Sequence, residues 1–246
     1  MRDATGPDPI ASLTVTKLRW LRDAEPENAA RVAAVALPHD WLTWRIAGYG
    51  PAGDESAPLG PDLGALVTDA SDASGTGYYD ATRGDGPDGR GAYRLDLLEF
   101  AFGRTDVVLP RVVGPSATAG VAHPSVAGSA VEGGTLLGPG AGDNAGAALG
   151  LGMVAGDVAV SIGTSGVVSA VTDDRTSDGS GLVNGFSDAS GRLGMRSPSR
   201  YGTSTSPSAP GGAWSASRDS PAWSTPRTAR AASSTRLALS VTASSR

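Results

Sequence analysis

The 246-residue chain combines a small net charge of −5 with 35 glycines, 17 prolines and no cysteine. The lack of cysteine excludes a disulfide framework and a thiolate metal site. Because the chain has no run of 18 apolar residues and no basic leader followed by an apolar run, we expect a cytoplasmic protein that does not bind a membrane.

Apolar residues recur at helical spacing in three segments of the first half of the chain. Pro38 suits the first turn of the second segment, and Asp40 can cap it. Trp20, Trp41 and Trp44 share the helical spacing, so we expect all three to pack in the core. The expected helices are residues 12 to about 23, 38 to 48 and 95–102, with a short helix from 27 that runs into a strand at 32–37.

The segments between these helices are polar or rich in glycine. Residues 49–64 and 81–91 indicate exposed loops, and residues 107–113 indicate extended chain interrupted by a proline. Residues 66–80 form a polar segment whose aspartates and hydroxyls resemble an oxygen-ligand cluster. It lacks the spacing and the closing glutamate of an EF-hand loop, so we expect no metal ion there. We interpret His39 as a cap or packing partner rather than a catalytic group.

The clearest β-hairpin in the chain pairs residues 157–162 with 166–171, and residues 182–186 are a plausible third strand. The hydrophobic pattern ends after Arg192. Residues 194–246 contain 14 serines, seven arginines and one aspartate, a composition that cannot bury enough surface to offset its ordering entropy. We therefore expect a disordered tail. It is a natural linker or, as we favour, the product of a shifted reading frame.

The scattered arginines of this tail also bear on nucleic-acid binding. A basic segment is typical of such binding where its charges cluster and alternate with aromatic residues. The seven arginines of residues 194–246 show neither feature. We expect no nucleic-acid partner.

Asp143 lies between a glycine-rich approach and a run of small residues that predicts a helix over 143–152. One interpretation is an N-cap that satisfies free amides at the helix start. The other is a general base that accepts a hydroxyl proton as the oxygen attacks a γ-phosphoryl group. A helix N-terminus attracts negative charge, so the two are compatible. Gly140 and Gly142 allow the backbone to approach a ligand closely.

Gly163, Thr164 and Ser165 form the predicted turn of the hairpin. An ordinary turn explains them, because glycine and serine are common turn residues. Turn amides and two hydroxyls are also suited to holding the β- and γ-phosphates of a nucleotide. The turn is not a Walker A loop, since the Gly-Lys-Ser/Thr core is absent.

Five motifs resemble, in their order, the FGGY sugar kinases of the xylulokinase type. The resemblance runs from about Ser12 to Arg192 and is carried by Val15–Leu21, Pro38–Arg45, Thr68–Thr76, Gly140–Ala145 and Ser161–Gly166. It implies an α/β fold of two actin-like, ribonuclease-H-like lobes, of which this chain holds the end of the first and the start of the second. The implied division is a disordered N-terminus at 1–11, first lobe at 12–152, second lobe at 153–193 and a low-complexity tail at 194–246.

The resemblance also implies an activity. It makes the protein an ATP-dependent kinase that converts D-xylulose to D-xylulose 5-phosphate, with Mg²⁺ bridging the nucleotide phosphates. Asp143 is the implied catalytic base with Asn144 beside it near the sugar, and Gly163, Thr164 and Ser165 form the implied phosphate loop.

The family's Asp-Xaa-Gly-Thr hairpin, its sugar-site histidine and its adenosine segment have no counterpart in this sequence. We therefore expect a truncated chain that is inactive alone. A non-catalytic remnant or interaction segment, or a kinase for ribulose, gluconate or glycerol, stays open, and the oligomeric state is not readable from the sequence.

Overall fold

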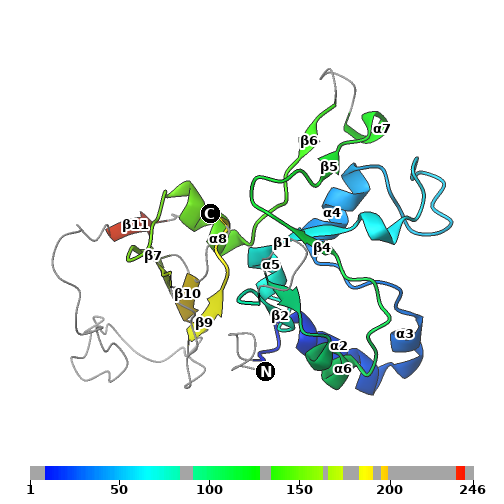
Figure 1. Cartoon of the computed structure of the whole chain (residues 1–246), viewed down its shortest axis with the longest axis horizontal. Coiled ribbons are helices and arrows are strands. Elements are labelled where there is room, and N and C mark those ends of the chain that lie inside the picture. Colours follow the sequence, from blue (N-terminus) through cyan, green and yellow to red (C-terminus); the bar gives the residue numbers. More distant parts are fainter. Residues whose placement is uncertain are drawn as a thin grey trace, which may run out of the picture.

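The computed structural model describes residues 9–83, 91–127, 134–162, 166–173, 183–190, 195–198 and 237–241. Figure 1 shows the helices and short strands of residues 9–127 on one side and a sheet of longer strands on the other, with the helix α8 (Asp143–Gly150) between them. None of the helices in these ranges is both long and apolar enough to cross a membrane.

The first region is built from helices joined by short strand pairs. Strand β1 (Val67–Asp69) pairs in parallel with β4 (Arg111–Val113), and β2 (Tyr79–Asp80) pairs antiparallel with β3 (Ala92–Tyr93). A third pair joins β5 (Gly120–Val121) to β6 (Leu136–Leu137). The helical elements are α2 (Thr14–Ala24), α3 (Pro26–Arg31), α4 (Pro38–Ile46), the 3-10 turn η1 (Leu63–Ala65), α5 (Ala70–Ser74), α6 (Leu95–Phe102) and α7 (Pro124–Ala127).

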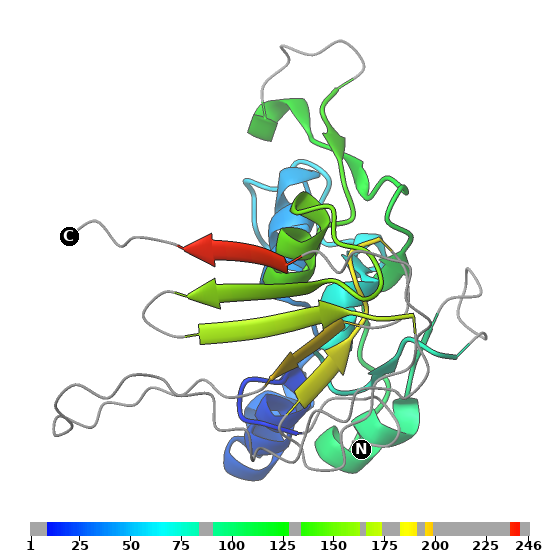
Figure 2. The same ribbon diagram turned by 90° about the vertical axis from the view of Figure 1, so that its left-hand side faces the viewer.

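The second region is a five-stranded sheet, seen face-on in Figure 2. Its strand order is β11-β7-β8-β10-β9, and only β11 and β7 run parallel. The predicted hairpin is confirmed as β7 and β8. The strands are β7 (Val158–Ile162), β8 (Gly166–Val171), β9 (Val183–Phe186), β10 (Met195–Pro198) and β11 (Leu237–Val241). Of residues 194–246, only β10 and β11 belong to the described residues.

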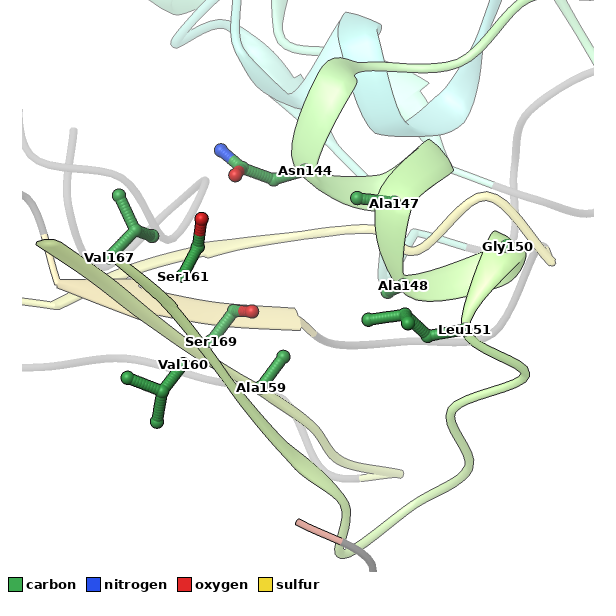
Figure 3. Close-up of a pocket in the computed structure, with 10 residues that line it drawn as sticks. All are labelled: Asn144, Ala147, Ala148, Gly150, Leu151, Ala159, Val160, Ser161, Val167 and Ser169. Carbon is green, nitrogen blue, oxygen red and sulfur yellow. The ribbon is translucent and has the colours of Figure 1, made fainter. Parts of the chain in front are cut away.

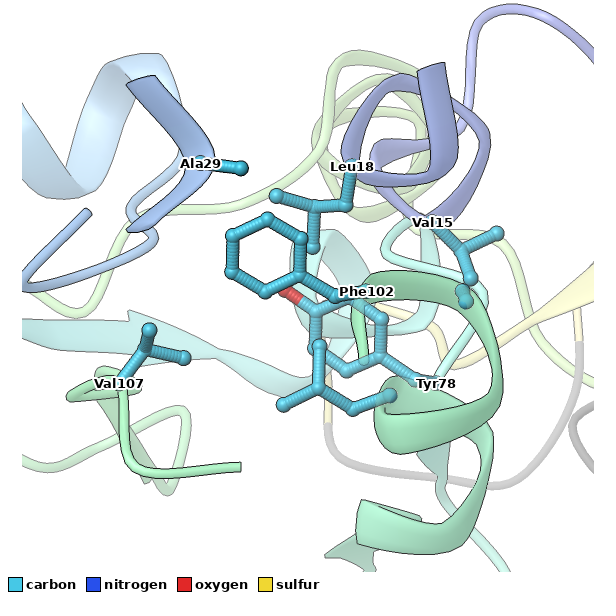
Figure 4. Packing of buried hydrophobic residues seen from close by; sticks show 8 residues of the cluster. Val15, Leu18, Ala29, Tyr78, Phe102 and Val107 are labelled. Carbon is cyan, nitrogen blue, oxygen red and sulfur yellow. The ribbon is translucent and has the colours of Figure 1, made fainter. Parts of the chain in front are cut away.

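The main hydrophobic core joins α2 to α6 and to the segment after α5. Phe102 and Tyr78 lie at its centre, between Leu18 on one side and Val107 on the other (Figure 4). Removing such side chains from water stabilises a fold by about 1.5–3 kcal/mol each. The amphipathic helices expected at the first and third segments are confirmed, and α6 has the predicted bounds.

The tryptophan prediction is wrong for two of the three residues. Trp44 is 1% exposed and donates its indole N–H to the Asp62 carbonyl at 2.7 Å. Trp20 is 59% exposed and Trp41 is 42% exposed, because each lies on the outer face of its helix. The strand expected at 32–37 is likewise reduced to a single bridge between Ala34 and Val108.

The polar segment 66–80 is buried, although its sequence indicates no regular element. Asp69 ends β1 and caps α5, where its carboxylate accepts the Ser71 N–H at 2.6 Å. The Ser74 hydroxyl donates to the Ala70 carbonyl at 2.8 Å, and the Thr76 hydroxyl donates to the Ala73 carbonyl at 2.6 Å. These local hydrogen bonds replace water, and so make the burial of the hydroxyls tolerable.

Candidate functional site

Three segments distant in sequence meet at the start of α8. They are the first turn of α4, the turn from β1 into α5, and the glycine-rich approach at residues 138–142. The β1–α5 turn is placed there by the parallel pairing of β1 with β4, and α4 packs directly against β1. The end of a buried strand thus faces the beginning of α8.

Asp143 is the first residue of α8, and its side chain is exposed to solvent. Gly142, not Asp143, occupies the N-cap position. The N-cap interpretation of Asp143 is therefore wrong: its Oδ1 accepts the adjacent Asn144 N–H at 2.7 Å and satisfies no amide further along the helix. An exposed carboxylate at the positive end of a helix dipole is accessible to a ligand and can accept a proton from it.

The residue before Asp143 is held by α5. The Gly142 N–H donates to the Ser71 hydroxyl oxygen at 2.9 Å. The Ser71 hydroxyl in turn donates to the Asp69 carboxylate through a short contact. Ser71 and Asp69 are both buried, so this chain of hydrogen bonds is shielded from water.

Gly140 has a backbone φ of +88°, a conformation that favours glycine. A Cβ at this position would overlap the His39 ring, with Nε2 only 2.5 Å away. Gly140 therefore makes room for a side chain of the protein itself. The expectation that it makes room for a ligand is not what the packing indicates.

His39 lies among three carboxylates, those of Asp40, Asp69 and Asp72. Its Nδ1 contacts Asp72 closely, and its Nε2 is 3.2 Å from Asp40 and 3.7 Å from Asp69. The hydrogen bond to Asp72, aided by the charges of Asp40 and Asp69, outweighs desolvation and raises the pKa of His39 to about 9. Burial raises the pKa of Asp40 to about 6 and also raises the pKa of Asp69.

Three residues of this group also have the spacing of a possible metal site. His39, Asp69 and Asp72 each bring one ligand atom within 4.8 Å of one another. We describe the group by its charge contacts, as an ion-pair cluster. Asp40 also serves as the predicted cap by accepting the Leu37 N–H at 2.8 Å.

A pocket of about 340 Å³ separates α8 from the β7–β8 hairpin. In Figure 3 the Asn144 amide projects from the first turn of α8 over the hairpin, where Ser161 and Val167 also line the pocket. Its other walls are mostly small or aliphatic: Ala147, Ala148, Gly150, Leu151, Ala159, Val160 and Ser169. A polar end on an otherwise apolar hollow is suited to a small polar ligand.

The second predicted motif, Gly163, Thr164 and Ser165, lies outside the described residues. Its flanking residues Ile162 and Gly166 are paired across the hairpin. Ser161, two residues before the motif, lines the same pocket as Asn144, the residue after Asp143. The structure therefore brings the neighbours of both motifs together, although they are 17 positions apart in the sequence.

Ser71 and the charged surroundings of His39 are the site residues that the sequence interpretation missed. The sequence signal for both is a polar run of aspartates and hydroxyl residues at 68–76. This run resembles an oxygen-ligand cluster, but nothing in it points to a partner 71 residues away.

Comparison with known proteins places this geometry in context. Residues 1–150 match the FGGY family of carbohydrate kinases, N-terminal domain. The xylulose kinase of Streptomyces rubiginosus is 42% identical over 189 residues, which are 77% of this chain and 34% of that protein. The xylulose kinase of Escherichia coli strain K12 is 30% identical over a similar length, 76% of this chain and 34% of that protein.

Solved structures give the same result. The xylulose kinase of Bifidobacterium adolescentis superposes with a TM-score of 0.69 at 47% identity, covering 80% of this chain and 39% of that protein. Plasmodium falciparum glycerol kinase has the same fold at 14% identity, with a TM-score of 0.60 and coverage of 80% and 36% of the two chains. The chain thus spans about a third of the length of the curated relatives it matches.

Proposed function

This chain belongs to the FGGY family of carbohydrate kinases, and we propose that it contributes the catalytic base and part of the sugar site to the phosphorylation of D-xylulose by ATP. The product is D-xylulose 5-phosphate. The observation that carries the proposal is the position of Asp143, an exposed carboxylate at the start of α8 beside the pocket that Asn144 and Ser161 line.

In the proposed reaction Asp143 acts as the general base. Its carboxylate accepts the proton of a sugar hydroxyl as that oxygen forms a bond to the γ-phosphorus of ATP, and the bond from that phosphorus to the β-phosphate oxygen breaks to release ADP. Asn144 lies one residue further along α8 and is proposed to hydrogen-bond the sugar. Positioned proton transfer of this kind contributes roughly 10²–10⁴-fold to a rate.

The nucleotide is proposed to bind at the β7–β8 hairpin. Ile162 and Gly166 are paired, so Gly163, Thr164 and Ser165 connect the two strands at the end where Ser161 lines the pocket. Glycine and two hydroxyls suit a phosphate loop. Mg²⁺, when bound with the nucleotide, would neutralise phosphate charge.

We further propose that the 246 residues do not turn over xylulose by themselves, because phosphoryl transfer needs both substrates held within a closed cleft. The test uses a chimaera in which the matching residues of this chain replace the aligned 189-residue segment of the Streptomyces rubiginosus xylulose kinase. We expect ATP-dependent xylulose 5-phosphate formation by the chimaera and none by the 246-residue chain.

Asp143→Asn in the chimaera should lower kcat by about 10²–10⁴-fold. Asp106→Asn is the matched control, because it removes an exposed carboxylate on another part of the chain. Equal activity of the Asp143→Asn and parent chimaeras would overturn the role of Asp143. Faster turnover of ribulose, gluconate or glycerol than of xylulose would show that the faster compound, and not xylulose, is the substrate.

A further inference from the structure

We infer that Ser71 is a positioning residue for Asp143, and that it acts through the Gly142 backbone with His39 as a second support beneath the same loop. The inference rests on the proposed function of Asp143 as the base. It gives the polar segment after β1 a role in holding the approach to Asp143, a role that the sequence of the segment does not reveal.

The first step is the hydrogen-bond chain. Asp69 ends a buried strand and accepts both the Ser71 N–H, at 2.6 Å, and the Ser71 hydroxyl. With its proton committed to Asp69, the Ser71 oxygen presents its lone pairs to the Gly142 N–H, 2.9 Å away. Gly142 immediately precedes Asp143, so this contact fixes the position of the backbone from which the Asp143 side chain extends at the start of α8.

The second step is the support beneath Gly140. The His39 ring packs against this glycine so closely that a Cβ would overlap it. His39 is itself held from two elements, by Asp40 of α4 and by Asp69 and Asp72 of the β1–α5 turn. Asp69 therefore serves both supports, since it accepts from Ser71 and faces His39.

Ser74 offers a matched comparison on the same helix. It is buried like Ser71, and its hydroxyl oxygen accepts the Ser187 N–H at 3.2 Å. Each serine thus links α5 to a later segment: Ser71 accepts the Gly142 N–H before α8, whereas Ser74 contacts both the N–H and, at 3.3 Å, the hydroxyl of Ser187 after β9. Only Ser71 contacts the residue next to Asp143, so the two variants separate a positioning effect from a general loss of stability.

The experiment uses the complete 246-residue chain, labelled with ¹⁵N and ¹³C, as wild type, Ser71→Ala, Ser71→Thr and Ser74→Ala. Amide hydrogen exchange reports the Gly142 N–H, and the carboxyl ¹³C resonance reports Asp143. We expect Ser71→Ala to accelerate Gly142 exchange by about fivefold to tenfold, the equivalent of one lost hydrogen bond. It should also shift the Asp143 resonance.

Ser74→Ala should lower the thermal stability of the chain about as much as Ser71→Ala does, and should accelerate amide exchange at Ser187. It should leave the exchange rate of Gly142 and the resonance of Asp143 unchanged. Ser71→Thr keeps the hydroxyl and should restore the Gly142 and Asp143 signals. Equal effects of Ser71→Ala and Ser74→Ala on Asp143, or no effect of either, would overturn the inference.

Two further readouts cover the other outcomes. If the Ser71 variants do not fold, the wild type decides, because a Gly142 amide that exchanges at the rate of an unprotected peptide contradicts the bond to Ser71. Xylulose phosphorylation by the chimaera tests the proposed function separately. A protected Gly142 and a responsive Asp143, together with a chimaera that does not phosphorylate xylulose, would uphold the support and reject the sugar.

Discussion

The two regions of the molecule are stabilised in different ways. Among the described residues, the first region buries large side chains, including Trp44, Tyr78, Leu98 and Phe102, each 2% exposed or less. In the same described part of the chain, the cluster between α8 and the sheet of the second region buries only Ala145, Ala148 and Val171, with Met153, Phe186 and Ala189 packed against it. The first region therefore has the larger hydrophobic contribution to its free energy of folding.

The site lies where these regions meet. Asp143 belongs to the helix of the small-residue cluster, yet its approach is held by Ser71 and His39 of the first region. A rigid scaffold can position a reactive group better than a weakly packed helix can by itself. The difference between the regions suggests that the large core holds the geometry while the small residues of α8 leave a pocket beside it.

The largest expected loss of stability comes from truncating a large side chain in the main core. Phe102→Ala should lower the free energy of unfolding by about 3–5 kcal/mol, because a buried aromatic side chain is lost and a cavity remains. Val171→Ala in the smaller cluster should cost only about 1–2 kcal/mol. Urea unfolding monitored by circular dichroism measures both. Equal losses would mean that the two regions do not differ as their packing indicates.

The ion-pair cluster gives the next effect, and it depends on pH. His39 has a folded pKa of about 9 against an ordinary value of 6.5, so its stabilisation is complete below about pH 6.5 and is lost as the pH rises through 9. The loss should reach at most about 3 kcal/mol. The raised pKa of Asp40, about 6, acts with the opposite sign at lower pH: it lowers stability as the pH rises from 3.8 through 6.

Thermal melts between pH 6 and pH 10 measure this loss, and His39→Asn is the control that should lack it. The chain has only two histidines. The imidazole resonances can therefore be assigned with a His123→Asn variant, and the midpoint of His39 read directly. A midpoint near 6.5 would contradict the cluster as an ion-pair group.

A smaller effect separates the two glycines of the approach to Asp143. Gly140→Ala should cost about 1–3 kcal/mol, because alanine is strained at a φ of +88° and its Cβ overlaps His39. Gly142→Ala should change stability by less than about 1 kcal/mol, since φ is −60° and the nearest atoms to a Cβ are 3.6 Å away. Chemical denaturation measures both losses of stability. Equal losses would contradict the packing of His39 against Gly140.

The smallest effect is expected at the surface of the first region. Asp106 forms an exposed ion pair with Arg104, with N and O atoms 2.7 Å apart. Solvent screens such a pair, so Asp106→Asn should melt at a temperature indistinguishable from that of the wild type. A clear loss would indicate that the scaffold depends on its surface charges as well as on its core.

Much of the local structure could be predicted from patterns of neighbouring residues. Helix α6 and the β7–β8 hairpin follow from apolar spacing. The start of α8 at Asp143 follows from a run of small residues after a glycine-rich segment, whereas the roles of Asp143 and Asn144 stay predictions. The tryptophans show the limit, because helical spacing places Trp20 and Trp44 equally well while tertiary packing buries only the second. A helix face becomes a core face only when another element covers it.

The sequence alone therefore determined the family-like motifs, most of the helices and the hairpin, since these depend on residues within a few positions of one another. The tertiary structure decided that Ser71 holds Gly142, that His39 lies beneath Gly140, and that Asn144 and Ser161 share one pocket. These contacts join residues from 17 to 101 positions apart. Their physical basis is the pairing of β1 with β4 and the packing of α4 on β1, which no local periodicity encodes.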